Sequence, residues 1–227
     1  MERRTYVLVH GGWHGAWCWR DVAAEFDRRD VAWRSLDLPS AHDTTGHSDL
    51  ADDARAVVDA THGAGPVVLV GHSYGGAVIA EAADLIDTLE GLTFLAALIP
   101  RTGQSSFDAS RELRARTELD DAIVVDGPLL RIAPERASAA FYGDCSIRDQ
   151  AWATQQLESQ TLASFRMVRD APDPSVTRRY ILCERDRAID PSIQELMAQR
   201  CDTVVRLSSD HSPFLSHPVA CVDAILA

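Results

Sequence analysis

The sequence predicts an α/β fold: a doubly wound, mainly parallel sheet of about six strands with helices on both faces. Two observations carry this prediction. Short apolar segments alternate along the chain with helical patterns, and several of these segments are apolar on consecutive residues rather than on every second one. Consecutive apolar residues are typical of strands buried on both faces of a parallel sheet, and right-handed crossovers through helices connect such strands.

The expected elements follow from these patterns. Apolar, β-branched segments predict strands at residues 5–10, 32–38, 66–71, 92–99, 177–183 and 202–208. Apolar residues spaced by three and four predict helices at residues 21–30, 49–62, 75–89, 190–201 and 218–227. Strand and helix therefore alternate in the N-terminal part of the chain and again near its C-terminus.

Residues 101–175 interrupt this alternation. Helical patterns recur at 108–117, 134–143 and 147–160, but no strand–helix unit is recognisable. Because a long structureless loop is uncommon in a compact domain, we expect a helical cap that is inserted after the fourth strand and packs over one edge of the sheet. The chain is then one domain, residues 1–227, with a cap insertion at about 101–175.

The composition narrows the classes of function. The chain has 227 residues, of which 46% are apolar, so it is long enough to bury a full hydrophobic core. Its 34 acidic and 22 basic residues give a net charge of −12, which argues against nucleic acid and anionic membranes as partners. The basic residues are all arginine, so Schiff-base chemistry and catalysis by lysine are excluded.

Cysteine usage and hydropathy predict a cytoplasmic protein that needs no metal or organic cofactor. The five cysteines are widely spaced and form no CxxC pair, which favours free thiols over a disulfide framework or a zinc site. The N-terminal apolar run YVLV is shorter than the ~7–15 residues of a signal peptide, and no stretch approaches the ~18 residues of a transmembrane helix. The sequence makes no prediction of the oligomeric state.

The segment VVLVGHSYGG, residues 67–76, runs from a predicted strand into a serine flanked by glycines. Gly71, Ser73 and Gly75 form the pattern G-x-S-x-G, in which a sharp strand-to-helix turn lifts the serine hydroxyl clear of the sheet. The first turn of the following helix also offers unpaired N–H groups to an anion. The strand before this pattern and the helix after it predict that Ser73 is displayed as a nucleophile.

A serine nucleophile needs a base and an acid that orients the base. His211 follows the sixth predicted strand and Asp186 follows the fifth, so both lie at the sheet edge that carries Ser73. Asp190 is the rival acid, but its position suits the N-cap of the next helix. Asp210, beside His211, is expected to serve a local turn.

An oxyanion formed during acyl transfer needs two aimed donors. The candidates are the N–H of Tyr74, which follows the nucleophile, and the N–H of Gly12, in the glycine-containing loop after the first strand. We also expect apolar side chains, mostly from the cap, to wall a substrate pocket, although most of them should be ordinary cap core. The candidates for these walls are Trp13, Phe107, Leu129, Leu130, Phe141, Trp152 and Phe165.

These segments together resemble the α/β-hydrolase fold family, and the likeness extends over essentially the whole chain. It rests on VLVHGGWHGAWCW, LDLP, VLVGHSYGG, the aspartate of CERDRAI and the histidine of SSDHSPF. The branch that they resemble holds plant methyl-salicylate and other methyl esterases, hydroxynitrile lyases and bacterial pyrethroid-hydrolase-like esterases. Its pattern H-G-x-x-H-G-x-W-x-W matches His10, Gly11, His14, Gly15, Trp17 and Trp19.

The resemblance implies a spatial strand order of 2-1-3-4-5-6 by chain number. It also implies a triad of Ser73, Asp186 and His211, with Gly12 and Tyr74 as the oxyanion hole, while His14, Trp17 and Trp19 have structural roles. The function expected is hydrolysis of a small apolar or aromatic carboxylic ester through an acyl-enzyme.

Two departures disfavour cyanide chemistry. Hydroxynitrile lyases of the branch place a threonine directly after the first-loop histidine and a lysine directly after the catalytic histidine, where this chain has Gly11 and Ser212. Another lyase, decarboxylase or thioesterase activity on the same fold, or a non-catalytic small-molecule receptor, is the alternative to the esterase.

Overall fold

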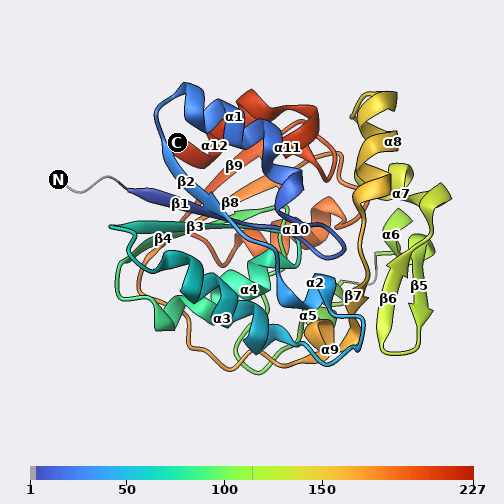
Figure 1. The fold of residues 1–227 in the computed structure, drawn as a ribbon, viewed down its shortest axis with the longest axis horizontal. Helices are drawn as coiled ribbons and strands as arrows, with labels where there is room; N and C mark the ends of the chain where they lie inside the picture. The colour runs from blue at the N-terminus through green and yellow to red at the C-terminus, as the bar shows by residue number, and fades with distance from the viewer. Residues whose placement is uncertain (1–3, 114) are drawn as a thin grey trace.

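The computed structural model describes residues 4–113 and 115–227. Its centre is a sheet of six parallel strands in the order β2-β1-β3-β4-β8-β9, as Figure 1 shows. When these six strands are numbered 1 to 6 in chain order, their spatial order is the predicted 2-1-3-4-5-6. Each strand pairs in parallel with its neighbours. The fold class expected from the sequence is confirmed. The strands are β1 (Thr5–Val9), β2 (Ala32–Ser35), β3 (Val67–His72), β4 (Leu89–Leu95), β8 (Thr177–Cys183) and β9 (Thr203–Leu207).

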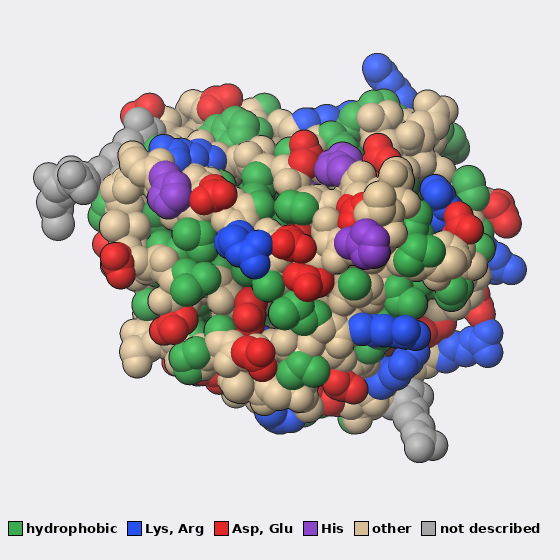
Figure 2. Space-filling model, turned by 60° about the horizontal axis from the view of Figure 1, so that its bottom comes forward, with side chains coloured by type: hydrophobic (Ala, Val, Ile, Leu, Met, Phe, Trp, Pro, Cys, Tyr) green, Lys and Arg blue, Asp and Glu red, His purple; other side chains and the backbone are tan. Residues whose placement is uncertain are grey.

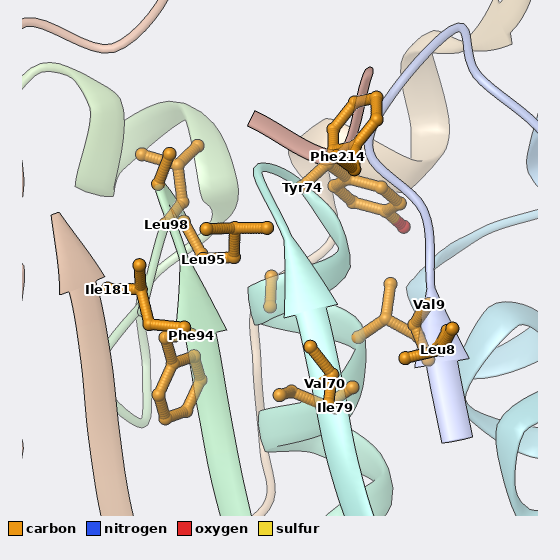
Figure 3. Close-up of a cluster of buried hydrophobic side chains, with 14 of the residues drawn as sticks. Leu8, Val9, Val70, Tyr74, Ile79, Phe94, Leu95, Leu98, Ile181 and Phe214 are labelled. Carbon is orange, nitrogen blue, oxygen red and sulfur yellow. The ribbon is translucent and has the colours of Figure 1, made fainter. Parts of the chain in front are cut away.

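Burial follows the position of each strand in the sheet. Every residue of β1 and β3, which lie inside the sheet, is buried, whereas the edge strand β2 is only half-buried and β9 is largely exposed. Consecutive apolar residues in β3 are needed because helices cover both of its faces. Figure 3 shows that side chains from neighbouring strands, among them Val70, Phe94 and Ile181, fill this core with Ile79 from the helix below.

Helices cover the two faces of the sheet. α1 (Arg20–Arg28), α11 (Pro213–Ser216) and α12 (Pro218–Leu226) pack together on one face, and α3 (Leu50–Thr61) and α4 (Gly75–Ala82) pack on the other (Figure 1). α10 (Pro191–Ala198) packs against β8. Acidic and basic side chains are interspersed on the face of the molecule in Figure 2.

The boundary between α4 and β4 differs from the prediction. The helix expected over 75–89 ends at Ala82, a 3₁₀ turn covers Ala83–Leu85, and β4 then begins at Leu89. The strand expected over 92–99 ends at Leu95. Ala96 has φ +43°, a left-handed conformation that a strand cannot continue. Beyond it the chain turns, and the Leu98 N–H donates to the Ser73 carbonyl at 3.0 Å.

The segment 101–175 lies between β4 and β8, and we refer to it as the cap. Its helices are α5 (Ser106–Ser110), α6 (Glu118–Ala122), α7 (Pro134–Phe141), α8 (Ile147–Gln156) and α9 (Leu162–Arg166). The helices expected over 134–143 and 147–160 correspond to α7 and α8, but the helix expected over 108–117 is wrong, because α5 ends at Ser110 and the next helix begins at Glu118.

The cap also contains a small antiparallel sheet that was not predicted, formed by β5 (Ile123–Asp126), β6 (Leu129–Ile132) and β7 (Gln160–Thr161). The two-residue loop Gly127-Pro128 joins β5 to β6, with Gly127 at φ +58°, and a glycine at the first loop position is a hairpin signal that the sequence did display.

Candidate active site

The turn after β3 holds Ser73 in a strained conformation. Ser73 has φ +53°, a left-handed value that is costly for a residue with a side chain. A Cβ atom on Gly71 would lie 2.5 Å from the Gly75 carbonyl oxygen, and one on Gly75 would lie 2.6 Å from the His10 carbonyl oxygen. The two glycines of the G-x-S-x-G pattern are therefore required by crowding, as this strand-to-helix turn demands.

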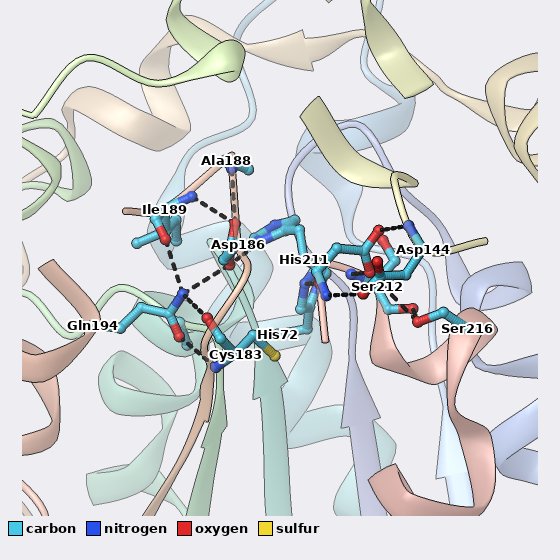
Figure 4. Close-up of polar contacts among 12 residues, drawn as sticks. His72, Asp144, Cys183, Asp186, Ala188, Ile189, Gln194, His211, Ser212 and Ser216 are labelled. Carbon is cyan, nitrogen blue, oxygen red and sulfur yellow. Dashed lines mark hydrogen bonds and ion pairs between the residues drawn. The ribbon is translucent and has the colours of Figure 1, made fainter. Parts of the chain in front are cut away.

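The structure brings His211 and Asp186 together at the same sheet edge. His211 Nδ1 and Asp186 Oδ2 are 2.7 Å apart, and both side chains are buried (Figure 4). The other carboxylate oxygen of Asp186 accepts the backbone N–H groups of Ala188 and Ile189 at 2.7 and 2.9 Å. Because an ionised carboxylate only accepts, His211 Nδ1 carries the proton, which leaves Nε2 as a base.

Gln194 on α10 completes the surroundings of Asp186. Its Nε2 donates to Asp186 Oδ2 at 2.8 Å and to the Ile189 carbonyl at 2.8 Å, while its Oε1 accepts the Cys183 N–H at 3.0 Å. Sequence analysis did not single out this residue. The available signal was a glutamine on the face of the 190–201 helix that also carries Ile193 and Met197, where a fully buried amide requires partners.

His72, next to Ser73, connects the serine turn to the loop of His211. Its Nε2 donates to the His211 carbonyl oxygen at 2.9 Å, and the two imidazole rings lie 4.5 Å apart. Burial, together with the neighbouring His211, holds the pKa of His72 well below its usual range, so the ring is neutral. The backbone of His211 is therefore fixed by the residue that precedes Ser73.

The loop after β1 lies against the serine turn. A Cβ atom on Gly11 would lie 2.8 Å from Ser73 Cβ, and one on Gly12 would lie 3.9 Å from Tyr74 Cβ. Among the described residues, neither the Gly12 N–H nor the Tyr74 N–H donates to another protein group. Two backbone N–H groups are thus left available beside Ser73.

Two neutral histidines hold this loop. His10 Nδ1 donates to the Gly11 carbonyl at 2.8 Å and its Nε2 accepts the Leu38 N–H at 2.9 Å; His14 Nδ1 donates to the Gly12 carbonyl at 2.8 Å. The Tyr142 hydroxyl donates to His14 Nε2 at 2.9 Å. Burial lowers the pKa of His10 to about 4 and that of His14 to about 3, which keeps one nitrogen of each ring as an acceptor.

The sequence matches the model of the alpha/beta hydrolase family over residues 6–224. The protein belongs to this family. A chloroplastic relative from Arabidopsis thaliana, methylesterase 11 by name, is 28% identical over 97% of this chain, which spans only 62% of that relative's length. Methylesterase 3 of the same plant is 27% identical over 96% of this chain and 93% of its own.

Solved structures agree with this assignment of the fold. A pyrethroid hydrolase from Sphingobium faniae superposes on this alpha/beta hydrolase with a TM-score of 0.83 at 24% identity. The superposition covers 98% of this chain and 96% of that chain, so the cap is included in the shared fold.

Two further aspartates of this alpha/beta hydrolase lie near the Asp186–His211 pair. The Asp190 side chain accepts the Ser192 N–H at the start of α10, which confirms the predicted N-cap. Asp210 accepts the Ser212 N–H within its turn, as expected, and it also accepts the Asp144 N–H of the cap at 2.8 Å. The loop of His211 is therefore tied to the cap, a contact that local sequence could not predict.

A cavity of about 790 Å³ opens at Ser73 between the sheet edge and the cap. Four of the predicted pocket residues line it, namely Trp13, Phe107, Leu130 and Phe165. The remaining apolar side chains that line it are Leu98, Leu113, Ala115, Leu119, Ile123, Ala188, Ile189 and Ile193.

Three predicted pocket residues, Leu129, Phe141 and Trp152, are not among the described residues that line this cavity. Successive strand residues alternate between faces, so Leu129 points away where its neighbour Leu130 faces the cavity. Phe141 is buried in an aromatic cluster, with its ring 5.7 Å from that of His211, and Trp152 packs against Trp17 of the 3₁₀ turn Ala16–Trp19.

Within the part of the chain that the structure describes, no group of three or more His, Cys, Asp and Glu side chains is arranged to hold a metal ion. The five cysteines are free thiols, four of them buried, and burial raises the pKa of Cys145 well above its usual range and that of Cys201 to about 12. No helix in residues 4–113 and 115–227 is both long and apolar enough to cross a membrane.

Proposed function

We propose that this alpha/beta hydrolase is a serine esterase that cleaves small apolar or aromatic carboxylic esters through an acyl-enzyme. The observation that carries the proposal is the buried Asp186–His211 hydrogen bond, made at the sheet edge where the backbone strains Ser73. The names of the methylesterases among its relatives support an ester as the substrate class.

The proposed mechanism assigns one task to each group. Ser73 Oγ attacks the ester carbonyl carbon while His211 Nε2 takes the hydroxyl proton, and Asp186 stabilises the imidazolium. The N–H groups of Gly12 and Tyr74 bind the oxyanion. His211 then gives the proton to the departing alcohol. Water, deprotonated by His211, attacks the acyl-enzyme in the same way and releases the acid with free Ser73.

The cavity sets the expected substrate. Its volume of about 790 Å³ accommodates a small ester with room to spare, and its aromatic and aliphatic walls favour apolar acyl or alcohol groups. Cyanohydrin cleavage by the route of the lyases is disfavoured, because Gly11 has no room for a threonine side chain beside Ser73. Ser212, where those lyases have a lysine, offers only a buried neutral hydroxyl.

The test compares Ser73→Ala with Ser110→Ala, since Ser110 lines the same cavity. Turnover of 4-nitrophenyl acetate should fall by up to ~10⁶-fold in kcat in Ser73→Ala and change little in Ser110→Ala. A fluorophosphonate should label the wild-type protein at the peptide that contains Ser73. Ester turnover near the wild-type rate in a folded Ser73→Ala protein would refute the proposed function.

A further inference from the structure

Trp13 directly follows Gly12, and its polar groups bind the cap. Its N–H donates to Gln160 Oε1 at 3.3 Å, its indole N–H donates to the Leu130 carbonyl at 3.0 Å, and its carbonyl accepts the Glu158 N–H at 2.9 Å. Trp13 has φ +62°, a left-handed value that surrounding contacts must maintain. The conformation of the loop that contains Gly12 therefore depends on residues of the cap.

Gln160, on β7 of the cap, continues this contact into the body of the protein. Its Nε2 donates to Ser40 Oγ at 2.6 Å and to Ser164 Oγ at 2.8 Å. The Ser40 hydroxyl donates to Asp53 Oδ2 at 2.5 Å, and the Ser40 N–H donates to Asp53 Oδ1 at 2.9 Å. Ser40 lies on the short helix α2 (Pro39–His42) and Asp53 on α3, and these side chains are all fully buried.

The same network reaches the second backbone donor. The Tyr74 hydroxyl donates to Asp53 Oδ2 at 2.7 Å, and Tyr74 follows Ser73, whose φ is also left-handed. Hydrogen bonds therefore connect the residue after Gly12 to the side chain of Tyr74 through Gln160, Ser40 and Asp53. The Ser40 and Tyr74 hydroxyls both donate to Asp53, and a carboxylate can accept the two hydrogen bonds at once. Burial raises the pKa of Asp53 to about 6, so at pH 8 it is ionised and can take this role.

The geometry of the Gly11–Gly12 peptide shows why this connection bears on catalysis. The Gly11 carbonyl accepts from His10 Nδ1 at 2.8 Å and from the His14 N–H at 3.3 Å. In a trans peptide the next N–H points opposite to that carbonyl, so the Gly12 N–H is directed away from the two histidines. A displacement of Trp13 is transmitted through Gly12 to this peptide and changes the direction of its N–H, and oxyanion stabilisation requires donors within ~2.7–3.1 Å of the oxyanion.

We infer that Gln160 is a positioning residue, through which the cap and the Ser40–Asp53 pair set the geometry of the Gly12 and Tyr74 N–H groups for an oxyanion. The inference rests on the proposed function, because it assumes that Ser73 forms a tetrahedral intermediate. A merely structural amide would contribute to stability alone, whereas a positioning residue changes the affinity for the transition state more than the affinity for the substrate.

The variant that tests the inference is Gln160→Met, which keeps the approximate volume and removes the amide. Gln150→Met is the matched control, because it removes a cap amide that donates to the Cys145 carbonyl and takes no part in this network. Both are assayed at pH 8 with 4-nitrophenyl acetate, a substrate with a short acyl group, and with a trifluoromethyl ketone, which adds to the serine and places an oxyanion in the hole. Melting temperatures report the stability of each variant.

The expected result for Gln160→Met is a loss of about tenfold in kcat with KM nearly unchanged. This loss is smaller than the ~10²–10³-fold loss for outright removal of an oxyanion donor. The Ki of the trifluoromethyl ketone should rise by the same factor as kcat/KM falls, and Gln150→Met should change neither by more than about twofold. Tyr74→Phe, which breaks the network at its other end and leaves the cap contacts in place, should shift kcat and Ki in the same direction.

Unchanged kcat and Ki in Gln160→Met, with a lower melting temperature, would overturn the inference and leave the esterase standing. If Gln160→Met does not fold, wild-type kcat and Ki in Tyr74→Phe would overturn it equally. Absence of Ser73-dependent turnover in the wild-type protein would overturn the proposed function and this inference with it.

Discussion

The two halves of the candidate site are held in different ways. Asp186 takes its hydrogen bonds from Ala188, Ile189, Gln194 and His211, all of which lie outside the cap. Trp13, in the loop of the candidate oxyanion donor, makes its hydrogen bonds to the cap instead. Asp186 is thus held by the sheet and its helices, although the loop of His211 also contacts the cap through Asp210 and Asp144. The oxyanion half depends directly on the cap, because Trp13 binds it. Substitutions near Asp186 should lower kcat by a similar factor for all ester substrates. Substitutions in the cap should instead change the activity on some esters more than on others.

The largest effect should come from Asp186→Asn. Loss of the carboxylate favours the wrong imidazole tautomer, and such a change can cost ~10⁴-fold in kcat. Asp190→Asn, which alters only the N-cap of α10, is the control and should retain most of the activity. The measurement is kcat with acetate, hexanoate and benzoate esters of 4-nitrophenol. A loss that varied strongly with the acyl group would contradict the independence of Asp186 from the cap.

Acid should destabilise the protein through the two histidines of the oxyanion loop. The folded-state pKa values of His10 and His14 are about 4 and about 3, below the usual 6.5. Between each folded-state pKa and 6.5, the unfolded chain therefore binds more protons than the folded protein. Stability is therefore full above pH 6.5 and declines as the pH falls towards 4, with a contribution of about 3 kcal/mol from His10.

The free energy of unfolding in urea, measured between pH 7 and 4.5, checks this expectation. His14→Asn should flatten the decline by about 2 kcal/mol, since the substituted residue no longer takes up a proton in the unfolded chain. His62→Asn is the control, because the His62 side chain is 72% exposed. Equal slopes for the wild-type protein and His14→Asn would show that the buried imidazole contributes nothing.

Gln194→Met tests the surroundings of the acid. It removes one of the donors that hold Asp186 in its buried site, so the carboxylate orients His211 less well and kcat should fall, though by less than the ~10⁴-fold expected for Asp186→Asn. Gln150→Met removes a comparable amide, which donates to the Cys145 carbonyl in the cap, and should leave kcat near the wild-type value. An equal loss in both variants would point to general destabilisation.

The smallest effect should come from the cap wall. Leu130→Ala enlarges the cavity, so the ratio of kcat/KM for hexanoate to that for acetate should rise by several-fold, up to about tenfold. Leu129→Ala, one residue earlier on the same strand and not among the described lining residues, should leave this ratio unchanged. An equal change of this ratio in both variants would show that selectivity among acyl groups does not depend on which leucine lines the cavity.

The sheet was predictable because local signals and global fold agree there. Consecutive apolar residues in 67–70 require a buried strand, and the glycines at 71 and 75 require a tight turn. The ends of parallel strands meet at one edge, so Asp186 and His211 could be placed beside each other although 25 residues separate them. The N-cap role of Asp190 followed from the same local reasoning.

The cap and the buried polar partners were decided by tertiary structure. Leu129 and Leu130 are equally apolar in the sequence. They differ in which face of the hairpin their side chains occupy, and only one of these faces meets the cavity. From the sequence alone, Gln160, Ser40 and Asp53 are polar residues of types that are usually exposed. They form a hydrogen-bonded network because three segments that are distant in the sequence bury them together. A strand or a reactive turn is encoded by neighbouring residues, whereas the partner of a buried polar atom is chosen by whatever the fold brings within about 3 Å of it.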